Sequence, residues 1–125
     1  MAHCDKYGIK LTAYSPMGGS PIAEERTNIT PDVRRALFSN DTIKTLATKY
    51  NKSIGQILLK YQVARGVIVI PKSVTKSRIA ENTQIFDFEL TSDEIDQLET
   101  LNKNIRYVHA QDLAGHTNFP FNEEF

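Results

Sequence analysis

The chain has 125 residues, 40% of them hydrophobic and 24% charged, which is typical of one modest globular domain. Fifteen basic residues balance fifteen acidic ones, so the charge balance excludes the strongly basic composition of proteins that bind nucleic acid or an anionic membrane. No apolar run approaches the roughly 20 residues that a membrane-spanning helix needs.

Residues 1–10 lack the apolar core of a signal peptide. Cys4 is the one cysteine in the sequence, so the chain has no internal disulfide and fits a reducing compartment such as the cytoplasm. The histidines, His3, His109 and His116, are scattered without the spacing of a metal site. We therefore expect no bound metal.

Residues 9–14, IKLTAY, alternate apolar and polar side chains and predict a short strand. Gly8 comes directly before them, where a helix would end, so the chain is expected to start within the last turns of a helix. Residues 15–21, SPMGGSP, have the composition of a turn. Residues 22–37 lack a clear period and predict a long loop, in which a helical turn could follow Pro31.

A helical period begins near residue 41, where Ile43, Leu46, Ala47 and Tyr50 fall on one face. A second helix is expected to start at Ser53, since Ser53 and Gln56 have the spacing of a capping box. Its apolar stripe is Ile54, Ile57, Leu58 and Tyr61, and Gly66 is expected to end it.

Residues 67–70, VIVI, are all β-branched and predict a strand of the kind that is buried on both faces of a parallel sheet. Thr75 is expected to cap a helix over residues 76–83. Thr91 and Glu94 form another capping box, and the segment from 106 to 125 predicts an extended tail on an apolar surface. The strand–helix–strand order indicates a βαβ unit of an α/β fold.

Both candidate binding motifs follow a strand, at the end where ligands collect in parallel sheets. After the second strand, Lys72 and Arg78 supply positive charge, and Ser73 and Thr75 supply hydroxyl groups beside a helix start. Together they predict a site for a phosphate-sized anion. The alternative is a solvated basic cluster at the start of a helix.

After the first strand, Gly18 and Gly19 would let a ligand approach the backbone closely. Tyr14 could offer a stacking face for a flat ring. The alternative, which the residues alone favour, is that Tyr14 belongs to the core and the glycines only make a turn.

The combination of TAYSPMG at 12–18 with VIVIPKSVTKSRIAEN at 67–82 resembles the C-terminal part of the aldo-keto reductases, and NFPFNEEF at 118–125 resembles the C-terminus of the aldose-reductase-like members. The resemblance covers essentially all of residues 1–125. It implies a partial TIM (β/α)8 barrel: the last two parallel strands with their helices, an extra helix near 92–102 and the C-terminal loop.

The resemblance also implies NADP(H) as cofactor. Tyr14 would stack on the nicotinamide, a group in the first turn would line the pyrophosphate, a group after the second strand would hold the 2′-phosphate, and two residues would face the adenine. In that order the implied residues are Tyr14; Ser15, Met17, Gly18 and Ser20; Lys72, Ser73, Thr75 and Arg78; Glu81 and Asn82. Val74 is a further residue expected at the cofactor site. The second glycine of SPMGGSP is one residue more than the common family pattern has.

The family reduces aldehydes and ketones with an Asp, Tyr, Lys and His group that precedes the region matched here. Nothing in residues 1–125 corresponds to that group, so we assign no catalytic residue and expect the chain to be inactive by itself. Two strands cannot close a barrel, so we also expect exposed strand faces, marginal stability, and self-association or docking to a complementary chain.

Three functions stay open: the NADP(H)-binding portion of a carbonyl reductase, a truncated isoform that docks on other barrel chains as an interaction or structural protein, and a stand-alone NADP(H)-binding module. The small carbonyl substrate would bind only in the completed protein. In this family the C-terminal loop shapes substrate choice, which suggests Leu113, Phe119 and Phe121 as substrate contacts. A tail packed only for stability is the alternative.

Overall fold

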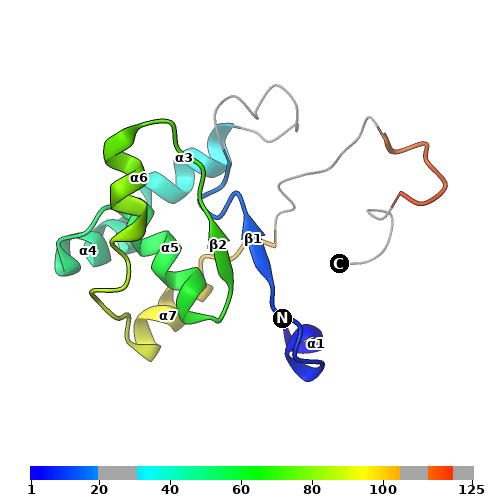
Figure 1. Ribbon diagram of the computed structural model, residues 1–125. Coiled ribbons are helices and arrows are strands. Elements are labelled where there is room, and N and C mark those ends of the chain that lie inside the picture. The colour runs from blue at the N-terminus through cyan, green and yellow to red at the C-terminus, as the bar shows by residue number, and fades with distance from the viewer. Residues whose placement is uncertain (20–30, 105–112, 120–125) are drawn as a thin grey trace.

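The computed structural model describes residues 1–19, 31–104 and 113–119. In chain order its helices and strands are α1 (Ala2–Lys6), β1 (Thr12–Tyr14), α3 (Pro31–Ser39), α4 (Asp41–Tyr50), α5 (Ile54–Ala64), β2 (Ile68–Ile70), α6 (Lys76–Thr83) and α7 (Ser92–Glu99). Helices α3 to α7 gather on one side of the two strands, and α1 lies apart from them near the start of β1 (Figure 1).

The two strands form a parallel sheet, as the strand–helix–strand order predicts. Thr12 pairs with Ile68, Ala13 with Val69 and Tyr14 with Ile70. The first strand is shorter than the expected 9–14. The backbone N–H of Ile9 instead donates to the carbonyl of Cys4 at 2.9 Å, which ties Ile9 to the end of α1. Gly8 has a φ of +68°, which confirms its place after a helix.

Both capping boxes are present. The Ser53 hydroxyl accepts from the backbone N–H of Gln56 while the Gln56 side chain accepts from the N–H of Ser53, and Thr91 and Glu94 repeat this arrangement at the start of α7. Gly66, with a φ of +77°, follows α5. These local signals therefore predicted the helix ends correctly, because they depend on atoms within a few residues.

One expectation was wrong, and another is confirmed only in part, since α6 spans the expected residues 76–83. The helical turn expected after Pro31 is the nine-residue helix α3. Thr75 does occupy the N-cap position of α6, but its side chain makes no capping hydrogen bond. The nearby Ser73 hydroxyl accepts from the backbone N–H of Thr75 instead, at 3.1 Å.

The core lies between α4, α5 and α7. Its buried side chains are Ile43, Leu46, Ala47, Ile57, Leu58, Leu90 and Leu98. Helix α5 contacts α4, α6, α7 and β2, and its central residues from 56 to 60 are all buried. The amphipathic stripe expected for α5 is therefore too narrow, because neighbours surround this helix on several sides.

Three ion pairs tie α7 and the segment before it to α4, to α5 and to the loop between those two helices. Lys52 Nζ lies 2.6 Å from Asp87, Lys60 Nζ lies 2.7 Å from Glu89, and Lys49 Nζ lies 2.7 Å from Glu94. The Glu94 carboxylate also accepts from the Tyr50 hydroxyl at 2.6 Å. Burial would raise the pKa of Glu94, but these hydrogen bonds and those from Thr91 lower it to about 2.

The prediction that residues 67–70 are buried on both faces is wrong for the described chain. Val67 is buried, whereas Ile68 and Ile70 are 51% and 55% exposed. Helix α5 contacts β2, and no described element covers the side on which Ile68 and Ile70 lie. The expectation of an exposed strand face is confirmed, since two strands cannot close on themselves.

No helix among the described residues combines the length and the apolar character that crossing a lipid bilayer requires.

Candidate functional site

The turns that follow β1 and β2 lie side by side, because the register places Tyr14 next to Ile70 at the end of both strands. Between them and the start of α5 runs a groove of about 670 Å³, a volume within the usual range of small-molecule sites. Its lining comes from five places in the chain: Ser15, Pro16, Met17 and Gly19; Phe38; Ser53, Ile54 and Gly55; Ile70, Pro71, Lys72, Ser73, Val74 and Thr75; and Arg78, Glu81 and Asn82.

The first turn has an unusual backbone. Ser15, Gly18 and Gly19 all have positive φ, at 50°, 84° and 84°, and the N–H of Gly18 donates to the carbonyl of Ser15 at 2.9 Å. Met17 is partly buried against the core. A Cβ atom at Gly55 would lie 3.2 Å from the Met17 sulfur, so this glycine lets the turn pack closely on the first turn of α5.

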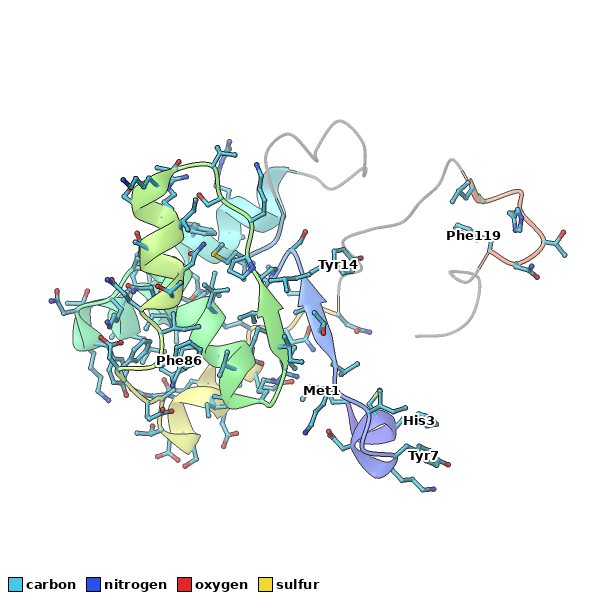
Figure 2. All side chains as sticks on the ribbon, in the orientation of Figure 1. Met1, His3, Tyr7, Tyr14, Phe86 and Phe119 are labelled. Carbon is cyan, nitrogen blue, oxygen red and sulfur yellow. The ribbon has the colours of Figure 1, made fainter. Side chains whose placement is uncertain are left out.

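Tyr14 and Gly18 lie beside this groove rather than in it. Both line a second cavity of about 770 Å³, which shares Ser15 and Pro16 with the first. The Tyr14 ring is 61% exposed, so it does not belong to the core, and it points away from the helices at the end of β1 (Figure 2). The ring is therefore open for a flat ligand to stack on it.

The second turn leads into α6. The hydroxyl of Ser73 is engaged with Thr75, from whose N–H it accepts and to whose carbonyl it donates at 3.4 Å. Because no side chain caps α6, the first backbone N–H groups of this helix stay open to an anion. The Thr75 hydroxyl makes no hydrogen bond with another described group and faces the same groove.

Lys72 and Arg78 are exposed and, within the described residues, neither forms an ion pair. This sets them apart from Lys49, Lys52 and Lys60, each of which meets a carboxylate within 2.7 Å. Two unpaired cations beside an uncapped helix start form an electropositive end of the groove. Such an arrangement suits a phosphate group, since an arginine fork and a lysine can both donate to its oxygens.

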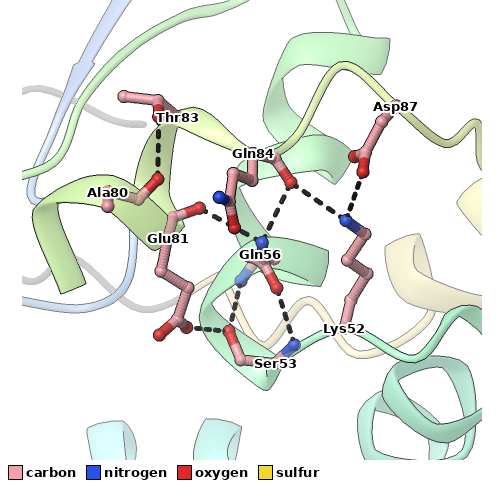
Figure 3. A network of polar contacts seen from close by, with 8 residues as sticks. All are labelled: Lys52, Ser53, Gln56, Ala80, Glu81, Thr83, Gln84 and Asp87. Atoms are coloured by element: carbon pink, nitrogen blue, oxygen red, sulfur yellow. Dashed lines mark hydrogen bonds and ion pairs between the residues drawn. The ribbon is translucent and has the colours of Figure 1, made fainter. Parts of the chain in front are cut away.

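The other end of the groove is built by α5 and the C-terminal half of α6. The Ser53 hydroxyl donates to the Glu81 carboxylate, and the Gln56 amide donates to the carbonyls of Glu81 and Gln84 at 3.1 and 2.9 Å (Figure 3). Sequence reasoning identified Ser53 and Gln56 as a capping box but did not place them at the site. Their proximity to Glu81 depends on packing between helices that local spacing does not reveal.

Tyr61 lines the second cavity with Arg65 and Glu99. Its hydroxyl donates to the Glu99 carboxylate, and the Arg65 guanidinium lies 4.9 Å from the ring centre. Burial, together with this hydrogen bond, raises the pKa of Tyr61 to about 12. This raised pKa makes the Tyr61 phenol a weaker proton donor than an ordinary tyrosine.

Two of the substrate contacts suggested for the tail, Leu113 and Phe119, are among the described residues, and neither lies at one of the two cavities. Leu113 is 56% exposed, Phe119 donates its N–H to the carbonyl of His116 at 2.9 Å, and neither lines the groove or its neighbour. Ser20 and Phe121 lie outside the described residues. No cluster of three potential metal ligands occurs in the part of the chain that the structure describes.

Comparisons with known proteins agree with the geometry. The model of the aldo/keto reductase family matches residues 1–103. Aldo-keto reductase family 1 member A1 is 42% identical in Sus scrofa and 46% in Gallus gallus, each over the whole of this chain and over 40% and 39% of the relative. The chain thus spans less than half the length of the curated relatives it matches.

Two solved structures are also similar. The aldose reductase of Schistosoma japonicum superimposes with a TM-score of 0.81 at 33% identity, covering 99% of this chain and 36% of that one. The Bombyx mori aldo-keto reductase AKR2E4, solved in complex with NADP, has a TM-score of 0.77 at 40% identity, covering 95% of this chain and 37% of that one.

Proposed function

Given that this chain belongs to the aldo/keto reductase family, we propose that residues 1–125 form the NADP(H)-binding portion of a reductase of aldehydes and ketones. The strands β1 and β2 would be the last two of a (β/α)8 barrel. The observation that carries the proposal is the groove itself: Lys72 and Arg78, both unpaired in the described chain, line it together with the turn that follows β1.

The cofactor would lie across both turns. Tyr14 would stack on the nicotinamide ring, and Glu81 and Asn82 would face the adenine. The pyrophosphate would contact the first turn through Ser15, Met17, Gly18 and Ser20, and the 2′-phosphate would contact Lys72, Ser73, Thr75 and Arg78. Val74 would be a further contact of the cofactor. The positions of the described residues support this assignment, because the exposed Tyr14 ring and the electropositive end of the groove lie on either side of the turn at Ser15.

Lys72 and Arg78, which meet no carboxylate in the described part of the chain, lead to a preference for NADPH over NADH. A 2′-phosphate carries up to two negative charges, and each hydrogen bond between charged groups contributes about 1.5–3 kcal/mol. NADH lacks this phosphate and would leave both cations without a partner. When bound, the cofactor supplies the hydride for carbonyl reduction, and the residues described here bind and orient it.

Fluorescence titration of the full chain with NADPH and NADH tests the proposal. We expect quenching with NADPH, weaker binding of NADH, and a loss of the difference in the Lys72→Ala and Arg78→Ala variants. Lys76→Ala is the matched control, since Lys76 lies on the same helix but does not line the groove. Equal affinity for both cofactors in the folded wild-type chain would contradict the proposal.

We further propose that these 125 residues reduce carbonyl compounds very slowly by themselves. They contain no match to the family's acid group, and general acid catalysis typically contributes about 10²–10⁴-fold. Mixing the pure chain with NADPH and an aromatic aldehyde should therefore give no measurable NADPH oxidation.

The lone Cys4, which forms no internal disulfide, supports a location in the cytoplasm.

A second candidate function is that of an interaction protein that docks on other barrel chains. It is favoured by the exposed face of β2, where Ile68 and Ile70 lie beside the equally exposed Tyr14. Size-exclusion chromatography with a full-length relative distinguishes the two functions. Co-elution without NADPH binding supports docking, whereas NADPH binding by the chain alone supports the cofactor site.

A further inference from the structure

Gln56 is a buried polar side chain at the contact between α5 and α6. It is 5% exposed, yet its amide is fully used: the oxygen accepts from the N–H of Ser53 at 2.9 Å, and the nitrogen donates to the carbonyls of Glu81 and Gln84. Those carbonyls belong to the last turn of α6 and to Gln84, the residue that caps its C-terminus, and the Glu81 carbonyl also accepts from the N–H of Gln84 at 3.0 Å. Gln56 thus fixes where the last turn of α6 lies relative to the start of α5.

Ser53 contacts the Glu81 side chain, which belongs to the same last turn of α6. Its hydroxyl accepts from the N–H of Gln56 at 3.2 Å and donates to Oε1 of Glu81. Within the described residues the other carboxylate oxygen of Glu81 makes no hydrogen bond, and both Ser53 and Glu81 line the groove. One oxygen of Glu81 is therefore held by the protein while the other is available to accept a hydrogen bond from a ligand (Figure 3).

We propose that Ser53 and Gln56 are positioning residues that aim the Glu81 carboxylate at the exocyclic amino group of the adenine. This inference rests on the proposed function. A carboxylate accepts hydrogen bonds and does not donate them, so it favours adenine, which presents an amino donor, over hypoxanthine, which presents a carbonyl at the same position. The capping box of α5 thereby serves two purposes: it starts the helix and it sets base recognition in the groove.

The experiment compares the affinity of the full chain for NADPH and for its hypoxanthine analogue. The Ser53→Asp variant keeps an N-cap acceptor for α5 but cannot donate to Glu81. The Gln56→Glu variant keeps the capping box, as Glu94 does at the start of α7, but loses both donors to α6. Ser53→Thr retains the hydroxyl group, and Thr91→Asp makes the same change as Ser53→Asp in the capping box that lies away from the groove.

We expect the wild-type chain, Ser53→Thr and Thr91→Asp to bind NADPH about tenfold more tightly than the analogue, the size of a hydrogen bond to a charged group. In Ser53→Asp and Gln56→Glu the ratio should fall to near one. A loss of overall stability, or repulsion of the phosphates by the added carboxylate, would weaken both ligands alike and leave the ratio unchanged.

The outcomes separate the inference from the proposed function. If the folded wild-type chain binds neither ligand, the proposed function fails. If it binds NADPH but does not distinguish the analogue, or if Ser53→Asp and Gln56→Glu keep the wild-type ratio, the positioning role is overturned. Circular dichroism on each variant confirms that the compared samples are equally folded.

Discussion

The two sides of the β1–β2 sheet carry similar side chains in opposite surroundings. On one side Val67 is buried and α5 packs on β2, while on the other Ile68, Ile70 and Tyr14 are each more than half exposed. All four residues of the VIVI run have high strand propensity, so the residue types do not explain the difference. What differs is whether another element of the described chain lies against each face.

The largest loss of stability should come from a change in the helical core, on the side of the sheet that α5 covers. Ile57 on α5 is fully buried in the core between α4, α5 and α7, so Ile57→Ala should lower the free energy of unfolding by about 2–5 kcal/mol. Ile68→Ala removes the same atoms from the open face and should cost well under 1 kcal/mol. Urea unfolding followed by circular dichroism measures both. Similar losses in the two variants would show that the open face is also covered in solution.

A smaller effect is expected at Glu94, which ties α7 to α4 through Lys49 and Tyr50. Glu94→Gln should lower the free energy of unfolding by about 1–3 kcal/mol at neutral pH. The amide has no negative charge, so the hydrogen bonds from Lys49 and Tyr50 to this side chain become weaker or are lost. The measurement is again the urea midpoint. Asp41→Asn is the control, because it removes the carboxylate of an ion pair with Lys44 that is exposed on both sides.

The same residue gives a pH dependence with a defined sign. The pKa of Glu94 is lowered from 4.5 to about 2 in the folded chain, so the folded state binds fewer protons than the unfolded state between those values. Its stabilising contribution is present above pH 4.5 and is lost as the pH falls toward 2. The wild-type urea midpoint should therefore decline over that interval more steeply than that of Glu94→Gln; parallel curves would contradict the assignment.

Gly66 joins the buried helix α5 to the half-covered strand β2 and has a φ of +77°. A Cβ atom there would meet nothing within 4 Å, so Gly66→Ala should cost only the backbone strain of about 1–2 kcal/mol. Gly115→Ala has equally open space without that φ and should change stability by a few tenths of a kcal/mol at most. Equal thermal midpoints for the two variants would rule out the strain.

The smallest stability effect is expected on the open face. Ile68→Lys should change the free energy of unfolding by less than about 0.5 kcal/mol, as is usual for exposed positions. It should, however, reduce concentration-dependent self-association, because a charge on an exposed strand face opposes pairing with another chain. Analytical ultracentrifugation over a range of concentrations compares it with the wild type. Unchanged association would show that chains meet through another surface.

Local chemistry could be predicted where it depends on a few neighbouring residues. The capping boxes at Ser53 and Thr91 and the glycines at positions 8 and 66 were correct for that reason. The parallel pairing of β1 with β2 followed from element order, and with it the meeting of the turns at Ser15 and Lys72 in one groove. The length of α3 was missed, although Val33, Ala36 and Leu37 have the spacing of one helical face.

Burial of polar groups could not be predicted in the same way. Gln56, Lys60 and Glu94 are buried, although their residue types are usually exposed. Each is accommodated by partners that lie between 25 and 45 residues away in the chain, such as Glu81 for Gln56 and Lys49 for Glu94. No local pattern marks such a partner, so the role of Ser53 and Gln56 beside the groove emerged only from the packed helices.

The order of residues by itself determined where helices start and stop, which segments become parallel strands, and that a basic turn follows the second strand, because these depend on short-range hydrogen bonding and side-chain periodicity. Tertiary structure alone decided which face of the VIVI run is covered, which lysines are neutralised, and that Lys72 and Arg78 form no ion pair within residues 1–19, 31–104 and 113–119. Those outcomes depend on which distant side chains come within a few ångströms of each other, and that distance is set by the packing of α4, α5, α6 and α7.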